Sequence, residues 1–143
     1  MKLPAKVEYA CNAAVELALR YDKNSPVQIR VIAKAQNIPK NFLLQLLIRL
    51  KNAGIVESNR GVSGGYFLVR SPSDIKLAEI VRAVDNTLLD ATPHRRRQYT
   101  NDSSELFIHF WDDMNKEWSR RLERTTLEDL TRQLQNSEPM YVI

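Results

Sequence analysis

The spacing of apolar residues changes midway through the chain, near Gly54. Between Pro39 and Ala53 the apolar residues recur three and four apart, which predicts a helix with one buried face: Phe42, Leu43, Leu46, Leu47 and Leu50. Pro39 suits the first helical position, and Gly54 suits the left-handed residue that ends a helix. Two β-prone runs follow at 55–58 and 66–69, and the glycine-rich segment between them predicts a hairpin.

Helical spacing also appears in four other stretches, and it predicts helices over 4–21, 27–36, 75–86 and 105–124. Thr125 and Glu128 match a capping box, which predicts that a short final helix begins there. Residues 87–104 have little periodicity and contain a run of three arginines, so we expect a solvated polar loop rather than a binding element.

A short amphipathic helix, a tight link, a second helix and a basic hairpin describe a winged helix-turn-helix, in which the second helix enters the DNA major groove. The expected fold is mainly α with a small β-hairpin. We expect residues 1–86 to form the winged helix-turn-helix DNA-binding domain. A loop over 87–104 would then connect it to a dimerisation helix and a short C-terminal helix over 105–143.

The longest predicted helix, 105–124, carries large apolar residues at spacings of four, three, four and four: Phe107, Trp111, Met114, Trp118 and Leu122. This seam could pack on its own domain. Two tryptophans and a phenylalanine on one helix exceed what a small domain needs, however, and an unpaired stripe favours self-association. We therefore predict that the seam forms a dimer interface.

Composition adds an asymmetry of charge. Residues 1–70 hold eleven lysines and arginines against four acidic residues, whereas 71–143 hold ten against thirteen. A basic half followed by an acidic half fits a DNA-binding module joined to a partner-binding module. No apolar run approaches a membrane span and no signal-peptide core follows Met1, so we expect a cytoplasmic protein without membrane contact. The single cysteine, Cys11, lies on an apolar stripe and is predicted to be a core residue.

Candidate base-reading groups lie off the apolar face of helix 39–53. Asn41 and Gln45 are four residues apart and so share one side, and amide side chains can bind adenine through two hydrogen bonds. Lys40 and Arg49 add cations for phosphates, and Lys6 on the first helix could do the same. Each of these could instead be an ordinary solvated side chain.

The hairpin loop begins with Arg60 and contains three glycines, which lack side chains and can approach a backbone closely. A glycine loop could also cradle a nucleotide phosphate, but this one lacks the P-loop spacing and lysine, and a strand follows where a helix should. No zinc-protease motif or nucleophile elbow appears, so we expect no enzyme activity.

Three segments carry a specific resemblance: KVEYA from Lys6, AKAQNIPKNFLLQLLIRLKNAGIVES from Ala33, and RGVSGGYFLVRSP from Arg60. They resemble the Rrf2 family of bacterial winged-helix regulators over most of the chain. The resemblance implies that the wing arginine enters the minor groove, that the second helix reads bases, and that the long helix crosses that of a second subunit. Leu44 departs from the family, which often carries a polar residue there. The DNA-contacting residues expected from pattern and resemblance are Lys6, Gln28, Lys40, Asn41, Phe42, Gln45, Arg49, Arg60, Gly61, Ser63 and Gly64.

Many members of that family hold an iron-sulfur cluster through three cysteines in the loop after the fourth helix. This chain has no cysteine between residues 87 and 104, so we expect no cofactor and no metal site. His94, Asp102, Glu105 and His109 could offer a mixed ligand set, although surface histidines near acids are more often solvated. Signal reception would then involve a small-molecule or protein effector near the dimer helices.

The sequence therefore predicts a cytoplasmic homodimer that binds a pseudo-palindromic duplex and regulates transcription, as a repressor. Two alternatives stay open at this point. One is a protein-interaction module that keeps the winged-helix shape without binding DNA. The other is a metal or redox sensor with non-cysteine ligands.

Overall fold

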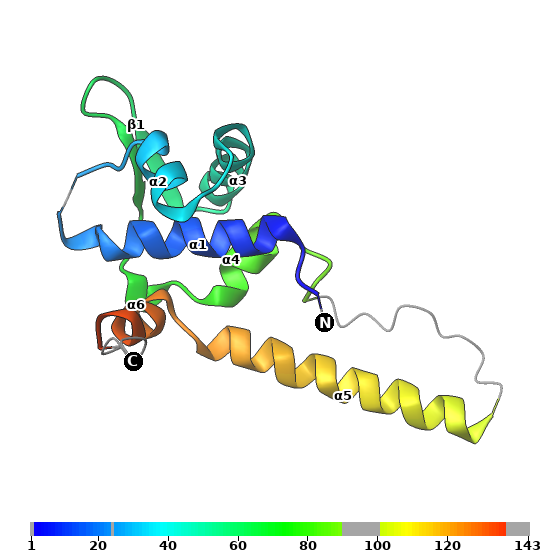
Figure 1. The fold of residues 1–143 in the computed structure, drawn as a ribbon. Helices are drawn as coiled ribbons and strands as arrows, with labels where there is room; N and C mark the ends of the chain where they lie inside the picture. Colours follow the sequence, from blue (N-terminus) through cyan, green and yellow to red (C-terminus); the bar gives the residue numbers. More distant parts are fainter. Residues whose placement is uncertain (1, 24, 90–100, 137–143) are drawn as a thin grey trace, which may run out of the picture.

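The computed structural model describes residues 2–23, 25–89 and 101–136 of the chain. Its elements are α1 (Ala5–Leu19), η1 (Tyr21–Lys23), α2 (Ile29–Gln36), α3 (Lys40–Asn52), β1 (Val56–Asn59), β2 (Gly65–Leu68), η2 (Pro72–Asp74), α4 (Leu77–Val84), α5 (Asp102–Arg124) and α6 (Leu127–Asn136). Helix α1 is central, with α2 and α3 on one side and α4 and α6 on the other (Figure 1). The predicted fold class, mainly α with one hairpin, is confirmed.

Helix α1 can occupy the centre because the residues on its inner side are mostly small. Val7, Ala10, Ala13, Ala14 and Leu17 are all buried. Alanine lets neighbouring helices approach closely, and α1 contacts α2, α3, α4 and α6. The apolar repeat over 4–21 therefore predicted the core face of this helix correctly. Cys11 also packs against the core, as expected.

The turn between α2 and α3 is tight. Asn37 ends α2 in the left-handed conformation at φ 52°, which asparagine tolerates better than most residues. Pro39 is the residue before α3 rather than its first helical residue, and Gly54 ends the helix region at φ 75° as predicted. Four of the five residues on the predicted apolar face are buried. Phe42 is 40% exposed, and its ring meets the Tyr9 ring edge-on at 5.5 Å.

Strands β1 and β2 pair antiparallel, with Val56 opposite Leu68 and Asn59 opposite Gly65. We call this hairpin, with its loop 60–64, the wing. An isolated β-bridge ties the segment before α2 to this hairpin, because Val27 and Tyr66 exchange two backbone hydrogen bonds of 2.8 Å. The prediction that Val27 begins the α2 helix was therefore wrong. Val27 is extended and buried against the hairpin, and α2 begins at Ile29.

The C-terminal part of the chain returns to the first domain. The N–H of Leu77 donates to the carbonyl of Thr125, and the N–H of Leu127 donates to that of Ile75, both at 2.9 Å. Ile75 was predicted to be helical but is extended here, since it forms one side of this two-bond link. Ile75 and Leu127 are both fully buried in the same core as α1, so α6 is anchored to the winged domain.

The start of α6 is capped one residue later than the sequence motif suggested. The N–H of Asp129 donates to the Thr126 hydroxyl at 3.1 Å, and the N–H of Thr126 donates back to the Asp129 carboxylate at 2.9 Å. The capping box is therefore Thr126 with Asp129, and the prediction of Thr125 with Glu128 was wrong. Thr125 instead closes the end of α5, because its hydroxyl donates to the Arg121 carbonyl at 2.7 Å.

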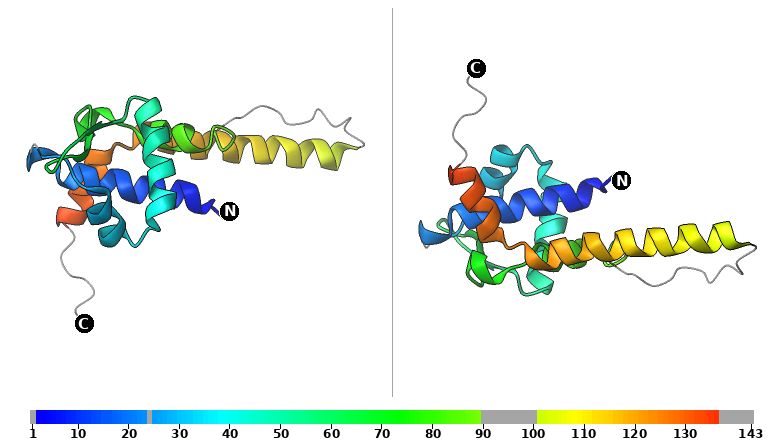
Figure 2. Two further views of the ribbon diagram at one scale, coloured as in Figure 1. Left: turned by 90° about the horizontal axis from the view of Figure 1, so that it is seen from above. Right: turned by 90° about the horizontal axis from the view of Figure 1, so that it is seen from below.

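Helix α5 is longer than predicted and extends away from the domain. It begins at Asp102, because the Asn101 side chain accepts a hydrogen bond from the N–H of Ser104 at 2.8 Å and so caps the first turn. The C-terminal end of α5 reaches α4 and α6, whereas its first turns project beyond the other helices in both views of Figure 2. No residue of α5 is fully buried. Of the predicted loop 87–104, residues 90–100 lie outside the described part of the chain.

Candidate nucleic-acid interface

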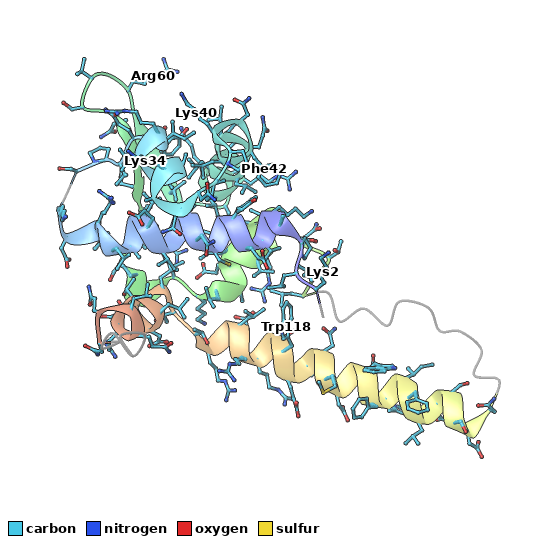
Figure 3. The ribbon with its side chains drawn as sticks, viewed as in Figure 1. Lys2, Lys34, Lys40, Phe42, Arg60 and Trp118 are labelled. Carbon is cyan, nitrogen blue, oxygen red and sulfur yellow. The ribbon has the colours of Figure 1, made fainter. Side chains whose placement is uncertain are left out.

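Basic side chains from separate elements gather on the side of α1 opposite α5. Figure 3 shows Arg60 on the wing, Lys40 at the start of α3 and Lys34 on α2, all on this side. We call the surface formed by the wing loop, the start of α2 and the outer side of α3 the wing–α3 face. This face combines the wing with α3, the second helix of the helix-turn-helix. These are the two elements that the sequence predicted to contact DNA.

A groove of about 460 Å³ lies between the wing and the starts of α2 and α3. Its lining includes Gln28, Arg30, Lys40, Asn59, Arg60 and Gly61. Gln28 spans its edge: the side-chain amide donates to the Val62 carbonyl at 3.3 Å, and its oxygen accepts from Arg30 Nε at 2.7 Å. Gln28 thus connects the wing loop to the start of α2, a role that its sequence position did not reveal.

The three wing glycines, Gly61, Gly64 and Gly65, are needed for different structural reasons. A Cβ on Gly64 would lie 2.3 Å from the Asn59 carbonyl oxygen, and one on Gly65 would lie 2.5 Å from the Val27 backbone. Both are therefore needed for close approach within the protein itself. Gly61 has φ +109° with open space around it, so it alone of the three leaves room for another molecule. Arg60 and Ser63 are exposed beside it.

The outer side of α3 is only partly polar. Lys40, Asn41 and Gln45 are exposed, as predicted. Between them lie two apolar side chains, Leu44 and Ile48, which are 39% and 43% exposed. The polar and apolar groups together form the surface that α3 offers to a partner.

Arg49, which the sequence grouped with these residues, is directed elsewhere. Its Nη1 donates to the carbonyl of Val84 at 2.9 Å, at the C-terminal end of α4. A cation at this end satisfies a carbonyl that the helix leaves unpaired and opposes the helix dipole. The structure therefore gives Arg49 a role in joining α3 to α4.

Lys6 is also engaged within the protein. Its Nζ lies 3.6 Å from the carboxylate of Asp85, just after α4. The same carboxylate accepts hydrogen bonds from the Thr87 hydroxyl at 2.6 Å and from the Thr87 N–H at 3.1 Å. The Thr87 hydroxyl bond lowers the pKa of Asp85 most; burial opposes it, and the Thr87 N–H and Lys6 add to the lowering. The carboxylate that holds Lys6 is therefore ionised at neutral pH.

Comparison with known proteins agrees with this architecture. Residues 3–133 match the Rrf2 family, described as an iron-dependent transcriptional regulator. The chain belongs to the Rrf2 family. It is 37% identical over 131 residues to the HTH-type transcriptional regulator IscR of Vibrio atlanticus, which covers 91% of this chain and 75% of that protein.

Solved structures of family members share the fold. IscR of T. potens superposes with a TM-score of 0.79 at 28% identity, over 99% of this chain and 95% of that one. CymR, the global cysteine regulator of B. subtilis, also gives 0.79 at 29% identity, over 92% of this chain and 97% of that one. This Rrf2 protein is thus a bacterial DNA-binding transcription regulator with a winged helix, and not an enzyme. DNA is its partner.

The family description raises the question of iron, and the donor groups of this chain do not suit a cysteine-ligated cluster. The whole sequence contains one cysteine, Cys11. Burial raises the pKa of that thiol to about 11, which disfavours the thiolate that would bind iron. Within residues 2–23, 25–89 and 101–136, no three His, Cys, Asp or Glu side chains gather as a metal site. His109 lies 3.7 Å from Glu105 on α5, and His94 is outside the described residues.

The predicted seam on α5 divides into two parts. Phe107, Trp111 and Met114 are 57%, 62% and 49% exposed. Trp118 and Leu122 are half-buried, Leu122 packs against the domain core, and Figure 3 shows Trp118 on the side of α5 turned toward the domain. Leu106 and Phe110 are also exposed, at 66% and 52%, and they widen the exposed part of the seam. The row of residues predicted from the sequence did not include them. We call the five exposed large apolar residues of this helix the α5 patch: Leu106, Phe107, Phe110, Trp111 and Met114.

Membrane insertion is not indicated by the helices described here. In that part of the chain no helix combines the length and the apolar composition that a bilayer crossing requires.

Proposed function

We propose that this regulator binds a pseudo-palindromic operator as a homodimer and represses transcription. One observation carries the proposal: the wing–α3 face and helix α5, which carries the α5 patch, lie on opposite sides of α1 (Figures 1 and 3), so a second copy could cover the patch while both copies keep their wing–α3 faces free. A two-fold dimer with two helix-turn-helix units needs an operator with matching symmetry. Because the bacterial chromosome lies in the cytoplasm, the proposal implies that compartment.

The α5 patch supports self-association by its size and composition. Five neighbouring large apolar side chains, each about half exposed or more, are unusual on a monomer of this length. The ring centroids of Phe110 and Trp111 are 5.2 Å apart in a T-shaped arrangement, so these two side chains already form a joined apolar surface. A second α5 helix is the partner of matching chemistry.

On the wing–α3 face we assign separate tasks to separate groups. Asn41 and Gln45 would read base edges in the major groove, because their amides are exposed and on one side of α3. Arg60 would enter the minor groove from the wing, and Lys40 would bind a phosphate at the start of α3. Gly61 and Ser63 would lie along the backbone beside Arg60.

The other predicted contacts are given supporting roles in the proposal. Gln28 would hold the wing loop in position through its bond to Val62, and Phe42 would brace α3 against Tyr9. Gly64 is buried and would act by shaping the loop. Lys6 and Arg49 would stabilise the contacts among α1, α3 and α4 and add positive charge near the backbone.

The proposal is tested by isolating genomic fragments that the purified protein retains and measuring affinity for the shared sequence against a scrambled duplex. Arg60→Ala is expected to weaken operator binding and to make the dependence of log affinity on log salt shallower by about one unit. Arg132→Ala is the matched control, because it removes the same charge from an exposed position on α6, away from the wing–α3 face. Equal affinities of Arg60→Ala and the parent would remove the wing from the interface.

Repression has its own test. In transcription with purified polymerase, the protein should lower the transcript from a promoter that contains the operator and leave a promoter with a scrambled operator unchanged. A rise in transcript would show an activator instead.

We further propose that operator binding needs no iron-sulfur cluster and that a small molecule or a protein partner near the α5 helices carries the signal. The single cysteine, Cys11, which packs against the core and has a raised thiol pKa, supports the first part. Protein made without oxygen should bind the operator equally before and after treatment with an iron chelator. Stoichiometric iron and acid-labile sulfide in the purified protein would contradict this.

A further inference from the structure

Two exposed apolar side chains occupy the middle of the α3 surface that faces outward. Leu44 and Ile48 are four residues apart, so they lie one above the other on the helix, beside Asn41 and Gln45. Their exposed fractions, 39% and 43%, contrast with the 3% or less of the four buried leucines of the same helix.

Neither side chain belongs to the hydrophobic core. They are absent from the core cluster and from the partly buried residues that pack against it. Phe42, the third exposed apolar residue of α3, does have a partner, because its ring contacts Tyr9. A single exposed leucine on a protein surface needs no explanation. An apolar pair at the centre of α3, the helix proposed to enter the major groove, can instead contact apolar groups on the edges of the bases.

We propose that Leu44 and Ile48 contact the 5-methyl groups of thymines and so give the operator half-site A·T pairs at the positions facing the middle of α3. The inference rests on the proposed binding of α3 in the major groove. On that edge of the base pairs the thymine methyl is the apolar group, and aliphatic side chains contact it. The ligand chemistry is therefore duplex DNA with thymine in the major groove.

The polar neighbours favour the same base pair. Asn41 and Gln45 carry the amides that pair with adenine, the partner of thymine. Guanine is usually read by arginine or lysine, but the one arginine on α3, Arg49, donates to the Val84 carbonyl, and Lys51 at the end of the helix pairs with Glu57. Lys40 is the cation at the first turn, where it can reach a phosphate. The outer side of α3 thus offers amide and aliphatic groups together, which suit A·T pairs.

Replacing thymine by deoxyuridine in the operator removes the methyl group and leaves the hydrogen-bonding edge unchanged. For the parent protein, each contacted methyl that is removed should weaken binding by about fourfold, the worth of one buried methyl group. Deoxyuridine outside the half-sites is the control and should change nothing. The double variant Leu44→Ala/Ile48→Ala should bind the thymine operator more weakly than the parent and should no longer distinguish the two duplexes.

The outcomes separate this inference from the proposed function. If the parent binds the operator specifically but tolerates deoxyuridine at every half-site position, the methyl contacts are refuted and the regulator function stands. If the parent shows no preference for any operator over scrambled DNA, the proposed function fails as well. Folding of the double variant is checked by its melting temperature, and the deoxyuridine measurement on the parent decides the question even if that variant is unstable.

Discussion

Arg49 shows how one position along a helix changes what a side chain can do. The sequence predicted that Arg49 contacts DNA, yet its guanidinium joins α3 to the last turn of α4 through the Val84 carbonyl. Gln45, one turn earlier, is exposed and has room to act on a partner. Sequence spacing could not separate them, because the position of α4 relative to α3 depends on the whole core.

We predict that Arg49→Ala lowers the free energy of unfolding by about 1.5 to 3 kcal/mol, the typical worth of a hydrogen bond from a charged group. Base preference on the operator should not change. Lys51→Ala is the control, since this cation of the same helix makes only exposed contacts, an ion pair with Glu57 and a hydrogen bond to Ser58, whose loss should alter stability little. Urea denaturation and operator titration measure the two effects. Loss of sequence preference without loss of stability would return Arg49 to the interface.

Cys11 provides a prediction with a defined pH dependence. Burial raises its pKa from 9.0 to about 11, so the folded state keeps the proton longer than the unfolded state. The stability contributed by the buried thiol is thus complete below pH 9.0 and is lost as the pH rises toward 11. At pH 8 the thiol of the folded protein is therefore almost entirely protonated.

A thiol reagent such as Ellman's reagent should accordingly react slowly at pH 8 in buffer and rapidly in urea. Cys11→Ser should remove the reaction entirely. Rapid, stoichiometric labelling of the folded parent would mean that Cys11 is accessible and available for redox chemistry.

At the scale of elements, the wing depends on a backbone contact with a segment far away in sequence. Gly65 leaves no room for a Cβ beside Val27, whereas Gly61 has open space and only its φ of +109° opposes a side chain. We predict that Gly61→Ala costs about 1 to 3 kcal/mol of unfolding free energy through backbone strain alone. Gly65→Ala should cost more and should expose the Val27 and Tyr66 amides to hydrogen exchange. Equal costs would mean that the Val27–Tyr66 bridge does not hold the wing.

The elements that the sequence predicted well are those whose pattern is local. Apolar repeats located α1, α3 and α5, and the glycine-rich segment located the wing, because a helix or hairpin with one buried side must show that period. Errors occurred where the chain pairs with a distant partner. Val27 is extended because it pairs with Tyr66, and Ile75 because it pairs with Leu127.

In the candidate site, too, features with a local sequence pattern were predicted and features that depend on distant segments were not. Exposure of Lys40, Asn41 and Gln45 followed from the period of α3. The tie between Gln28 and Val62, and the patch residues Leu106 and Phe110, could not be inferred without knowing which surfaces stay uncovered.

For the whole molecule, the opposite placement of the wing–α3 face and the α5 patch links assembly to affinity. If two copies join through α5, each brings one α3 to one half-site, and the second contact becomes intramolecular. Binding to a full operator should then greatly exceed binding to a half-site. The fold of each subunit should not depend on this union, since the patch contributes nothing to the core.

The double variant Phe110→Glu/Trp111→Glu tests that arrangement, because four carboxylates would face one another across the proposed two-fold interface. We predict a monomer in sedimentation, with an unfolding midpoint close to that of the parent because both side chains are more than half exposed in the single chain. The monomer should retain half-site affinity and lose the gain on the full operator. Lys116→Glu, an exposed charge change off the apolar stripe of the same helix, should leave the dimer intact. A dimer that survives the double variant would show that the subunits meet through another surface and that the proposed α5 interface is wrong.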